Sequence, residues 1–307
     1  MTKPVITIGT FDGVHKGHQY LLAETVKEAR LCKAKSIVIT YPIHPLEIIH
    51  NKIFPYLLTE PEKREYLIKK IGIDEVYYLN FDKILSQMTA ENFLKDILIK
   101  QFKPQTILTG YDTHFGINRT GNTEFLKQRA FFYNYKIKEV LPLYVNDIIP
   151  GSSLIRDLIS SGLVSSAFKY LGHYFSIIGT VVSGKKIGRT LGFPTINLQP
   201  IEVNKLIPAN GVYFTCSKID NKLYYGATNI GVSPSIKTEN KVEIETFLLN
   251  FSANVYNQKV ELFFIEKIRD EKKFNNQQEL INQIFMDIES IKSKIIHFHE
   301  WNTLKES

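Results

Sequence analysis

Short apolar runs alternate with amphipathic segments through the first half of the chain. The apolar runs cover residues 5–9, 36–41, 75–80, 106–111 and 137–143, and helical patterns lie between them near residues 17–32, 60–71, 89–101 and 122–134. This strand–helix order predicts an α/β fold with a parallel sheet and helices on both faces. Ligands bind such sheets at the carboxyl ends of the strands, so functional residues are expected there.

The pattern changes beyond Gly172, where short strand patterns with turn signals replace the helices. They cover residues 176–184, 211–231, 241–251 and 259–269. This density predicts an antiparallel β-barrel, with a tight turn at Asp220 and Asn221. Residues 277–298 predict a C-terminal helix whose apolar stripe would pack on the barrel: Leu280, Ile281, Ile284, Phe285, Ile288, Ile291 and Ile295. We therefore expect two domains, residues 1–172 and 173–307.

Composition is that of an ordinary globular protein. Of 307 residues, 44% are hydrophobic and 22% are charged. The two cysteines, Cys32 and Cys216, lie far apart and suggest neither a disulfide framework nor a metal site. The first apolar run is too short for a signal peptide, and no run approaches the roughly 20 apolar residues of a membrane span. We expect a soluble, cytoplasmic protein.

A net charge of +7 raises the question of nucleic acid as a partner. The basic residues come in pairs at most, such as Lys272 and Lys273, whereas a dedicated nucleic-acid patch needs a longer tract. Positive charge also attracts small anionic ligands, which are the expected partners. His297, His299 and Trp301 are expected to be surface or packing residues and not a metal site. The sequence leaves a homo-oligomer open.

A Gly-rich segment at residues 184–198, GKKIGRTLGFPTINL, begins the second half. Gly188 and Gly192 let a loop close tightly over a ligand. Positive charge on the loop comes from Lys185, Lys186 and Arg189. These features suit a phosphate group, although a plain hairpin with a solvated basic rim has the same composition.

The end of the same segment predicts a metal site. Pro194 fixes the direction of the chain as it enters a strand, in which Thr195 and Asn197 point to the same side. Hydroxyl and amide oxygens suit Mg²⁺ that is carried in with ATP. On a later strand, Glu243 and Glu245 share a face, where a carboxylate would lie inside the barrel or at its mouth. Alternation alone does not choose between these two glutamates.

Residues 9–19, GTFDGVHKGHQ, follow the first predicted strand. Gly9, Gly13 and Gly17 let the backbone approach a ligand, and the next helix offers free N–H groups to a phosphate. His15 and His18 are three residues apart, so both can face the same phosphate if the first turn is helical. A purely structural histidine is the alternative for either one.

Three more polar segments end predicted strands or begin helices. The first carries His44, and the second, GYDTHFGINRTGN, carries Asp112 and Arg119. In the third, PGSSLIRDLISSG, we expect Ser152 or Ser153 to cap a helix, Arg156 to lie one turn further on, and Gly162 to end the helix. Capping explains the serines without any function, but it does not explain the placement of the arginine.

GRTLGFPTINL resembles the signature of riboflavin kinases, and ATNIGVSPSI, VEIETFLLNF, IRDEKKF and QELINQIFMDI extend the resemblance towards the C terminus. It implies that Thr195 and Asn197 bind Mg-ATP and that Glu245 is the catalytic base. Phe247 and Asn250 depart from the His and Asp that relatives often carry.

GTFDGVHKGHQ resembles HxGH-type nucleotidyltransferases with a Rossmann-like sheet, in particular the adenylyltransferase module of bacterial FAD synthetases. TYPIHP, GYDTHFGINRTGN and PGSSLIRD resemble its later motifs, with departures at Tyr41, Ile43, Thr113, Asn122 and Gly151. The resemblance implies that His15, His18 and Arg156 stabilise the transferred phosphate. Across both halves, the nucleotide and phosphate contacts would come from Gly9, Phe11, Asp12, Gly13, Gly17, His44, Asp112, Arg119, Ser152, Ser153, Lys185, Gly188, Arg189, Gly192 and Pro194.

The resemblance therefore implies an enzyme that phosphorylates riboflavin to FMN and adenylylates FMN to FAD, with ATP and Mg²⁺. One alternative is an enzyme with a disabled N-terminal half, suggested by Thr113 and Asn122. Another is a flavin-sensing, RNA-binding regulator with little turnover.

Overall fold

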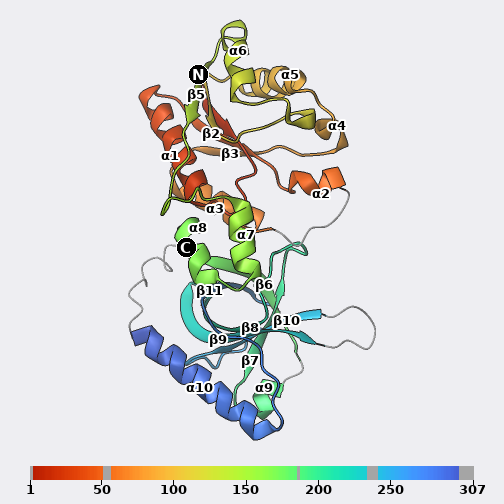
Figure 1. Cartoon of the computed structure of the whole chain (residues 1–307), viewed down its shortest axis with the longest axis vertical. Helices are drawn as coiled ribbons and strands as arrows, with labels where there is room; N and C mark the ends of the chain where they lie inside the picture. The colour runs from red at the N-terminus through yellow and green to blue at the C-terminus, as the bar shows by residue number, and fades with distance from the viewer. Residues whose placement is uncertain (1–2, 51–56, 185–186, 234–240, 297–307) are drawn as a thin grey trace. The chain divides into compact units, whose positions relative to one another are not determined.

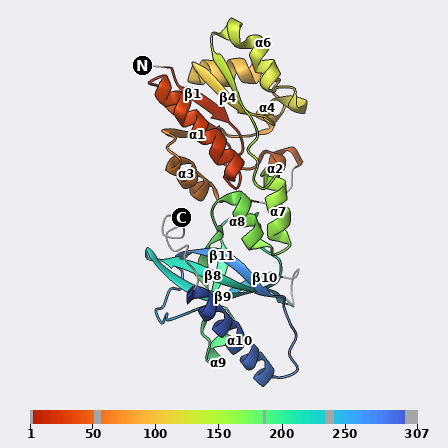
Figure 2. The same cartoon turned by 60° about the vertical axis from the view of Figure 1, so that its left-hand side comes forward.

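The computed structural model describes residues 3–50, 57–184, 187–233 and 241–296 (Figure 1). The chain divides into two compact units, residues 1–152 and 153–307. Each unit is built on its own sheet (Figures 1 and 2).

The first unit contains a five-stranded sheet with the strand order β3-β2-β1-β4-β5. Every pairing in it is parallel, which confirms the predicted fold class. The strands are β1 (Val5–Ile8), β2 (Ser36–Thr40), β3 (Glu75–Tyr78), β4 (Thr106–Gly110) and β5 (Lys136–Val140).

Helices cover both faces of this sheet, because its central strands are apolar on both sides. Val5 packs with Leu22 and Leu67 in one buried cluster, and its neighbour Ile6 packs with Leu94 in another on the opposite face. The helices are α1 (Lys16–Leu31), α2 (Pro45–His50), α3 (Pro61–Lys70), α4 (Lys83–Ser86), α5 (Ala90–Asn92), the π-type helix η1 (Phe93–Phe102), the 3₁₀ turn η2 (Ile117–Arg119) and α6 (Thr123–Tyr133). The short elements α2, α4 and η2 were not predicted.

The second unit contains a closed barrel with the strand order β10-β7-β6-β11-β8-β9. All its pairings are antiparallel, as predicted. Its strands are β6 (Phe175–Val182), β7 (Thr195–Pro200), β8 (Gly211–Ile219), β9 (Lys222–Ser233), β10 (Lys241–Leu248) and β11 (Lys259–Arg269). Asp220 and Asn221, with φ of 46° and 61°, form the predicted tight turn between β8 and β9.

Four helices accompany the barrel strands. They are α7 (Ser152–Ser160), which begins at the last residue of the first unit, α8 (Val164–Leu171), α9 (Ile187–Thr190) and α10 (Gln277–Ile296). Gly162 and Gly172 follow α7 and α8 with φ of 78° each, which a glycine adopts without strain. Helix α8 contacts β6 and β11, and α10 contacts β9. The domain boundary at residue 172 stays a prediction.

A row of threonines marks the inside of the barrel. Thr215, Thr228 and Thr246 are fully buried, and their hydroxyls bond to one another across β8, β9 and β10 at 2.7 and 2.8 Å. Successive side chains of a strand point to opposite faces. Glu245 and Phe247, on either side of Thr246, therefore point to the outer face of the barrel.

Candidate active sites

Polar side chains from three adjacent barrel strands form a row on that outer face. Glu245 of β10 pairs with Asn197 of β7 on one side and with Asn229 of β9 on the other. In the next row Phe247 pairs with Thr195. Directly opposed residues of antiparallel strands share a face. Of the two expected positions, inside the barrel or at its mouth, the first is excluded, because the adjacent Thr246 takes the inward position.

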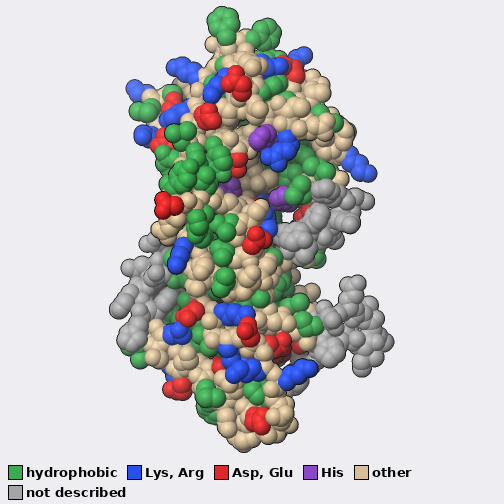
Figure 3. Space-filling model, in the orientation of Figure 1, with side chains coloured by type: hydrophobic (Ala, Val, Ile, Leu, Met, Phe, Trp, Pro, Cys, Tyr) green, Lys and Arg blue, Asp and Glu red, His purple; other side chains and the backbone are tan. Residues whose placement is uncertain are grey.

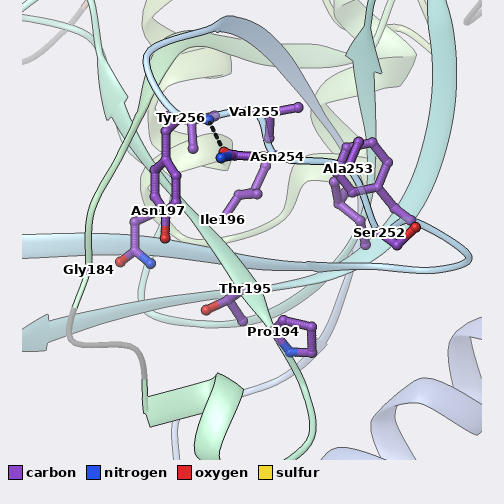
Figure 4. A pocket seen from close by; sticks show the side chains of 13 residues that line it. Gly184, Pro194, Thr195, Ile196, Asn197, Ser252, Ala253, Asn254, Val255 and Tyr256 are labelled. Atoms are coloured by element: carbon purple, nitrogen blue, oxygen red, sulfur yellow. Dashed lines mark hydrogen bonds between the residues drawn. The ribbon is translucent and has the colours of Figure 1, made fainter.

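Two cavities meet at Thr195. The larger, about 570 Å³, is lined by Gly184, Pro194, Thr195 and Asn197 together with the loop of residues 251–256. Figure 4 shows Thr195 and Asn197 on the same side of β7, as predicted. The smaller, about 290 Å³, is lined by Thr195, Glu245 and Phe247 among others. Both volumes are of the order found for ligand pockets, about 300–1,000 Å³.

The structure distinguishes Glu245 from Glu243, which strand alternation alone could not do. Glu245 lines the smaller cavity, whereas Glu243 is not among the lining residues of either cavity. Both are partly buried. Only Glu245 is therefore placed to touch a molecule in the smaller cavity.

Glycines of the Gly-rich segment lie directly against the polar residues of β7. A Cβ atom on Gly184 would collide with the amide of Asn197, and one on Gly188 would be 2.5 Å from the carbonyl oxygen of Phe193 and 3.3 Å from the hydroxyl of Thr195. Gly192 has a φ of 88°, a conformation that favours glycine. Lys185 lies outside the described residues, as does the side chain of Arg189, so their roles stay predictions.

Helix α10 covers the smaller cavity. Leu280 and Ile284 of the predicted apolar stripe line it, and Phe285 contacts Phe193 edge to face at 5.0 Å. Further along the helix, Ile291 is fully buried against the barrel. The stripe therefore packs on the barrel as predicted only in its second half, and its first half covers a cavity.

An ion pair fixes α10 beside that cavity. Arg269 of β11 donates to both carboxylate oxygens of Asp287 at 2.8–3.0 Å, and Asp287 is 5% exposed. Arg269, Asp287 and Asn229 all line the smaller cavity, and none of them was predicted. The signal was present, because the segments ATNIG, IRDEKKF and IFMDI contain them.

In the first unit, the loop between β1 and α1 brings His15 and His18 together. His15 caps α1, its Nδ1 accepting from the backbone N–H of His18 at 3.3 Å, and the two rings stack at 3.6 Å. A neutral His15 that accepts at Nδ1 carries its proton on Nε2. The predicted shared face is confirmed, and Figure 3 shows histidine side chains gathered on one face of this unit.

The residues just before His15 are buried in the loop. Phe11 is 1% exposed, and Asp12 is fully buried with its carboxylate accepting from the backbone N–H groups of Leu58 and Thr59. Gly13 has a φ of 85°, and a Cβ on Gly17 would be 3.2 Å from the His15 ring. Gly9 faces the Phe11 ring at the same distance. The roles of these residues as ligand contacts stay predictions.

The segment after β4 forms its own turn. His114 Nδ1 lies 2.8 Å from the carbonyl oxygen of Asp112 and 3.1 Å from Arg119 Nη2. Asn122 caps α6 by accepting from the N–H of Phe125 at 2.9 Å. His44 bonds within its own turn, where Nδ1 accepts from the N–H of Leu46 at 3.3 Å. Contacts of this segment with a nucleotide stay predictions.

The serines before Arg156 do not cap α7, contrary to expectation. The helix begins at Ser152, so Ser152 and Ser153 occupy its first two positions and Gly151 precedes it. The hydroxyl of Ser152 donates instead to the carbonyl oxygen of Asp12 at 2.9 Å. Ser153 and Arg156 belong to the second unit, and their contribution to a phosphate clamp stays a prediction.

Burial controls the titration of tyrosines near the carboxyl ends of the strands. It raises the pKa of Tyr41 after β2. Burial, and then the charge of Asp112, raise the pKa of Tyr111 after β4. Both phenols are therefore neutral hydrogen-bonding groups at physiological pH.

A metal ion could draw on few protein ligands here. The described part of the chain contains no group of three or more His, Cys, Asp or Glu side chains that could hold a metal. Oxygen ligands such as Thr195 and Asn197 remain, and Mg²⁺ commonly combines one or two protein ligands with substrate phosphates. Among the described helices, none is both long and apolar enough to cross a membrane.

Fold and sites define a two-part protein, with a parallel α/β sheet followed by a closed antiparallel barrel. Family models give the class of each part: that of FAD synthetase matches residues 1–153, and that of riboflavin kinase matches residues 171–295. The chain belongs to the family of bifunctional riboflavin kinase/FMN adenylyltransferases.

Named relatives of this family match nearly the whole chain. The protein of Buchnera aphidicola subsp. Schizaphis graminum is 39% identical over 291 residues, which are 94% of this chain and 92% of the relative. That of Escherichia coli K12 is 31% identical over 284 residues, 92% and 90% of the two chains. A crystal structure from Streptococcus pneumoniae, named as a macrolide-efflux protein, has a TM-score of 0.86 at 29% identity and covers 95% of this chain and 94% of its own.

Proposed function

We propose that this chain converts riboflavin to FMN in its barrel unit and FMN to FAD in its first unit, using one ATP for each step. The observation that carries the kinase half is the pair of cavities that share Thr195, with Asn197 in the larger and Glu245 in the smaller. Two substrates placed on either side of one residue can react directly, because alignment supplies much of the rate of phosphate transfer.

In the kinase step, ATP would occupy the larger cavity and riboflavin the smaller. Glu245 accepts the proton of the ribityl 5′-hydroxyl, and the resulting oxygen attacks the γ-phosphorus of ATP. The bond from that phosphorus to the bridging oxygen breaks, and ADP leaves. The apolar lining formed by Phe193, Phe247 and Ile284 suits a flavin ring.

The residues of β7 fit Mg²⁺. Thr195 and Asn197 present a hydroxyl and an amide oxygen to the larger cavity, and the absence of a side chain at Gly184 leaves room for the amide. Both would hold the ion, which when bound neutralises phosphate charge. The protein's own part is to fix these two oxygens on one face of a strand.

In the adenylyl transfer, an oxygen of the FMN phosphate attacks the α-phosphorus of ATP and pyrophosphate leaves. The stacked pair of His15 and His18 at the start of α1 supports this, because a helix N-terminus and imidazole N–H groups stabilise phosphate charge. Ser152, whose hydroxyl donates to the carbonyl oxygen of Asp12 in the same loop, is proposed to belong to this site; the roles of Ser153 and Arg156 stay predictions from the sequence. Cytoplasmic location stays a prediction.

The test is to incubate the full chain with ATP and Mg²⁺ and either riboflavin or FMN, and to separate the flavins by chromatography. We expect riboflavin to pass through FMN to FAD. FMN as the sole product would contradict the adenylyltransferase half, and FAD only from supplied FMN would contradict the kinase half. RNA binding without either product would favour a regulator.

A further inference from the structure

One arginine that no motif singled out lies buried under the ends of two central strands. Arg64 of α3 is 1% exposed. Its Nη1 donates to the carbonyl oxygen of Thr10 at 3.0 Å, and its Nη2 donates to that of Tyr41 at 2.6 Å. Thr10 follows β1 and Tyr41 follows β2, so one guanidinium joins the carboxyl ends of two neighbouring parallel strands. A buried charge is costly unless its hydrogen bonds are made.

The segment of residues 58–64, which ends at Arg64, also holds the loop on the other side of Phe11. The carboxylate of Asp12, fully buried, accepts from the N–H of Leu58 at 3.0 Å and from that of Thr59 at 3.0 Å. Residues 58–64 are therefore hydrogen-bonded to residue 10 through Arg64 and to residue 12 through two backbone amides. The two contacts form a clamp around Phe11.

The clamp holds a backbone conformation that the sequence does not favour. Phe11 and Val14 have φ of 49° and 38°, in the left-handed region that side chains with a Cβ seldom adopt. Such strain persists only where the surroundings determine the conformation. The Phe11 ring in turn meets His18 edge to face at 5.2 Å, so the residue held inside the clamp contacts one of the two stacked histidines.

We propose that Arg64 is a positioning residue for the adenylyl transfer, acting through the backbone of Thr10 and Tyr41 on the loop that carries His15 and His18. This inference rests on the proposed function of the first unit. It predicts an effect on the rate of reaction of bound substrates more than on their binding. A displacement of about 1 Å in catalytic groups can cost roughly 100-fold in rate.

The test compares the full chain with its Arg64→Met and Arg64→Lys variants. Methionine keeps much of the length of the side chain and removes both hydrogen bonds, and lysine keeps the charge but has no planar fork to bridge two carbonyls. Arg129→Met is the matched control, since Arg129 lies in α6 of the same unit, pairs with Glu91 and stacks on Phe125. Riboflavin phosphorylation by the same samples reports the integrity of the second unit.

For Arg64→Met we expect kcat of FAD formation from FMN to fall roughly 10- to 100-fold, with KM for ATP and FMN changed by less than about threefold. Arg64→Lys should recover part of the loss, and Arg129→Met should keep the wild-type kcat. An Arg64→Met variant that keeps the wild-type kcat, or raises KM alone, overturns the inference.

The test still decides if one of the variants fails to fold. If Arg64→Met no longer folds its first unit, Arg64→Lys decides, with kcat expected to be roughly 3- to 10-fold lower at unchanged KM; wild-type kcat in folded Arg64→Lys overturns the inference. Failure of the wild-type chain to make FAD would contradict the proposed function itself, which is a different outcome from a wild-type enzyme that is indifferent to Arg64.

Discussion

Glu245 and Glu243 stand two residues apart on the same face of β10 but meet different surroundings. Glu245 lies between Asn197 and Asn229 and lines the smaller cavity, and Glu243 pairs with Gly231 outside it. The two side chains are therefore chemically identical and differ only in their position. The pair offers a matched test of whether position confers the function of a base.

Replacing Glu245 with Gln should lower the rate of riboflavin phosphorylation roughly 10²- to 10⁴-fold, the range expected for loss of a general base. FAD formation from supplied FMN should persist, because that site lies in the other unit. The measurement is the initial rate of each reaction by flavin chromatography. Glu243→Gln is the control and should keep both rates; equal loss of both activities in Glu245→Gln would indicate misfolding and contradict the assigned role.

Replacing His18 with Ala should give the opposite pattern, with FMN formed and FAD formation reduced roughly 10²- to 10³-fold. The imidazole stacks on His15 and meets Phe11 edge to face, so its loss removes a group that stabilises phosphate charge. His173→Ala, in the other unit, serves as the control for FAD formation. Wild-type FAD formation by His18→Ala would refute the assignment.

Two departures from the family pattern have a local explanation. Asn122 caps α6 with its side-chain oxygen, a task that Asp and Asn perform about equally well. Asn250 has a φ of 55°, and Asn and Asp both tolerate this left-handed conformation. At both positions Asn supports the same local backbone structure as Asp. Neither change is therefore a reason to expect that one half of the enzyme is inactive.

At the scale of elements, Asp74 joins three parts of the first unit. It lies between α3 and β3, accepts from the N–H and hydroxyl of Ser36 at the start of β2, and pairs with Arg30 of α1 at 2.9 Å. The Arg30 guanidinium, together with the Ser36 hydrogen bonds, holds the pKa of the Asp74 carboxyl well below its usual range.

Replacing Asp74 with Asn should destabilise the first unit by about 1–2 kcal/mol near neutral pH, because hydrogen bonds to a charged group are lost. A carboxyl whose pKa is lowered on folding stabilises the protein fully above its unfolded pKa, about 3.9, and this contribution is lost as the pH falls towards the folded pKa. Urea unfolding at several pH values should therefore show a constant difference above about pH 5 that narrows below about pH 4.

The neighbouring pair of Lys35 and Glu75 is the control for that experiment. Its side chains are 69% and 47% exposed, and exposed pairs contribute little. Glu75→Gln should change stability much less than Asp74→Asn. A difference between wild type and Asp74→Asn that widens on acidification would contradict the assigned direction of the pKa.

Local periodicity accounts for what the sequence predicted at this scale. The common side of Thr195 and Asn197 follows from the repeat of a strand. The strands and long helices were placed correctly for the same reason. His15 and His18 lie together because His15 caps α1 and accepts from the N–H of His18, three residues further on. The turn at Asp220 and Asn221 follows from residue types that favour a positive φ.

Contacts between distant segments account for what the sequence did not predict. The amides that hold Asp12 lie 46 and 47 residues away in sequence, and Arg64 is 54 residues from Thr10. The hydroxyl of Ser152 has an even more distant partner, the carbonyl of Asp12, and so does not cap its own helix. The outward direction of Glu245 could be known only once Thr246 was placed inside a closed barrel.

At the scale of the whole molecule, each unit carries one of the two cysteines. Cys32 is partly exposed at the end of α1, and Cys216 of β8 is fully buried. Burial raises the pKa of the Cys216 thiol to about 12, so at neutral pH it stays protonated and unreactive. The two thiols therefore report separately on the two units.

A thiol reagent at pH 8 should label Cys32 in the native protein and leave Cys216 unmodified. Labelling of Cys216 should begin only at urea concentrations that open the barrel, and peptide mass spectrometry assigns the modified cysteine. Ellipticity in the near ultraviolet, measured in parallel, gives the unfolding transition. Equal labelling rates of the two cysteines without urea would contradict a closed barrel core.

The strand orders of the two sheets have a consequence for aggregation. Each of the six barrel strands has two neighbours, so that sheet offers no open edge to another chain, whereas the parallel sheet ends at β3 and β5. Charged side chains occupy both edges: Glu75 on β3, and Lys136, Lys138 and Glu139 on β5. Lysine at an edge discourages the addition of a further strand. Neutralising the charges of these two short strands is therefore expected to favour intermolecular β-pairing through the first unit.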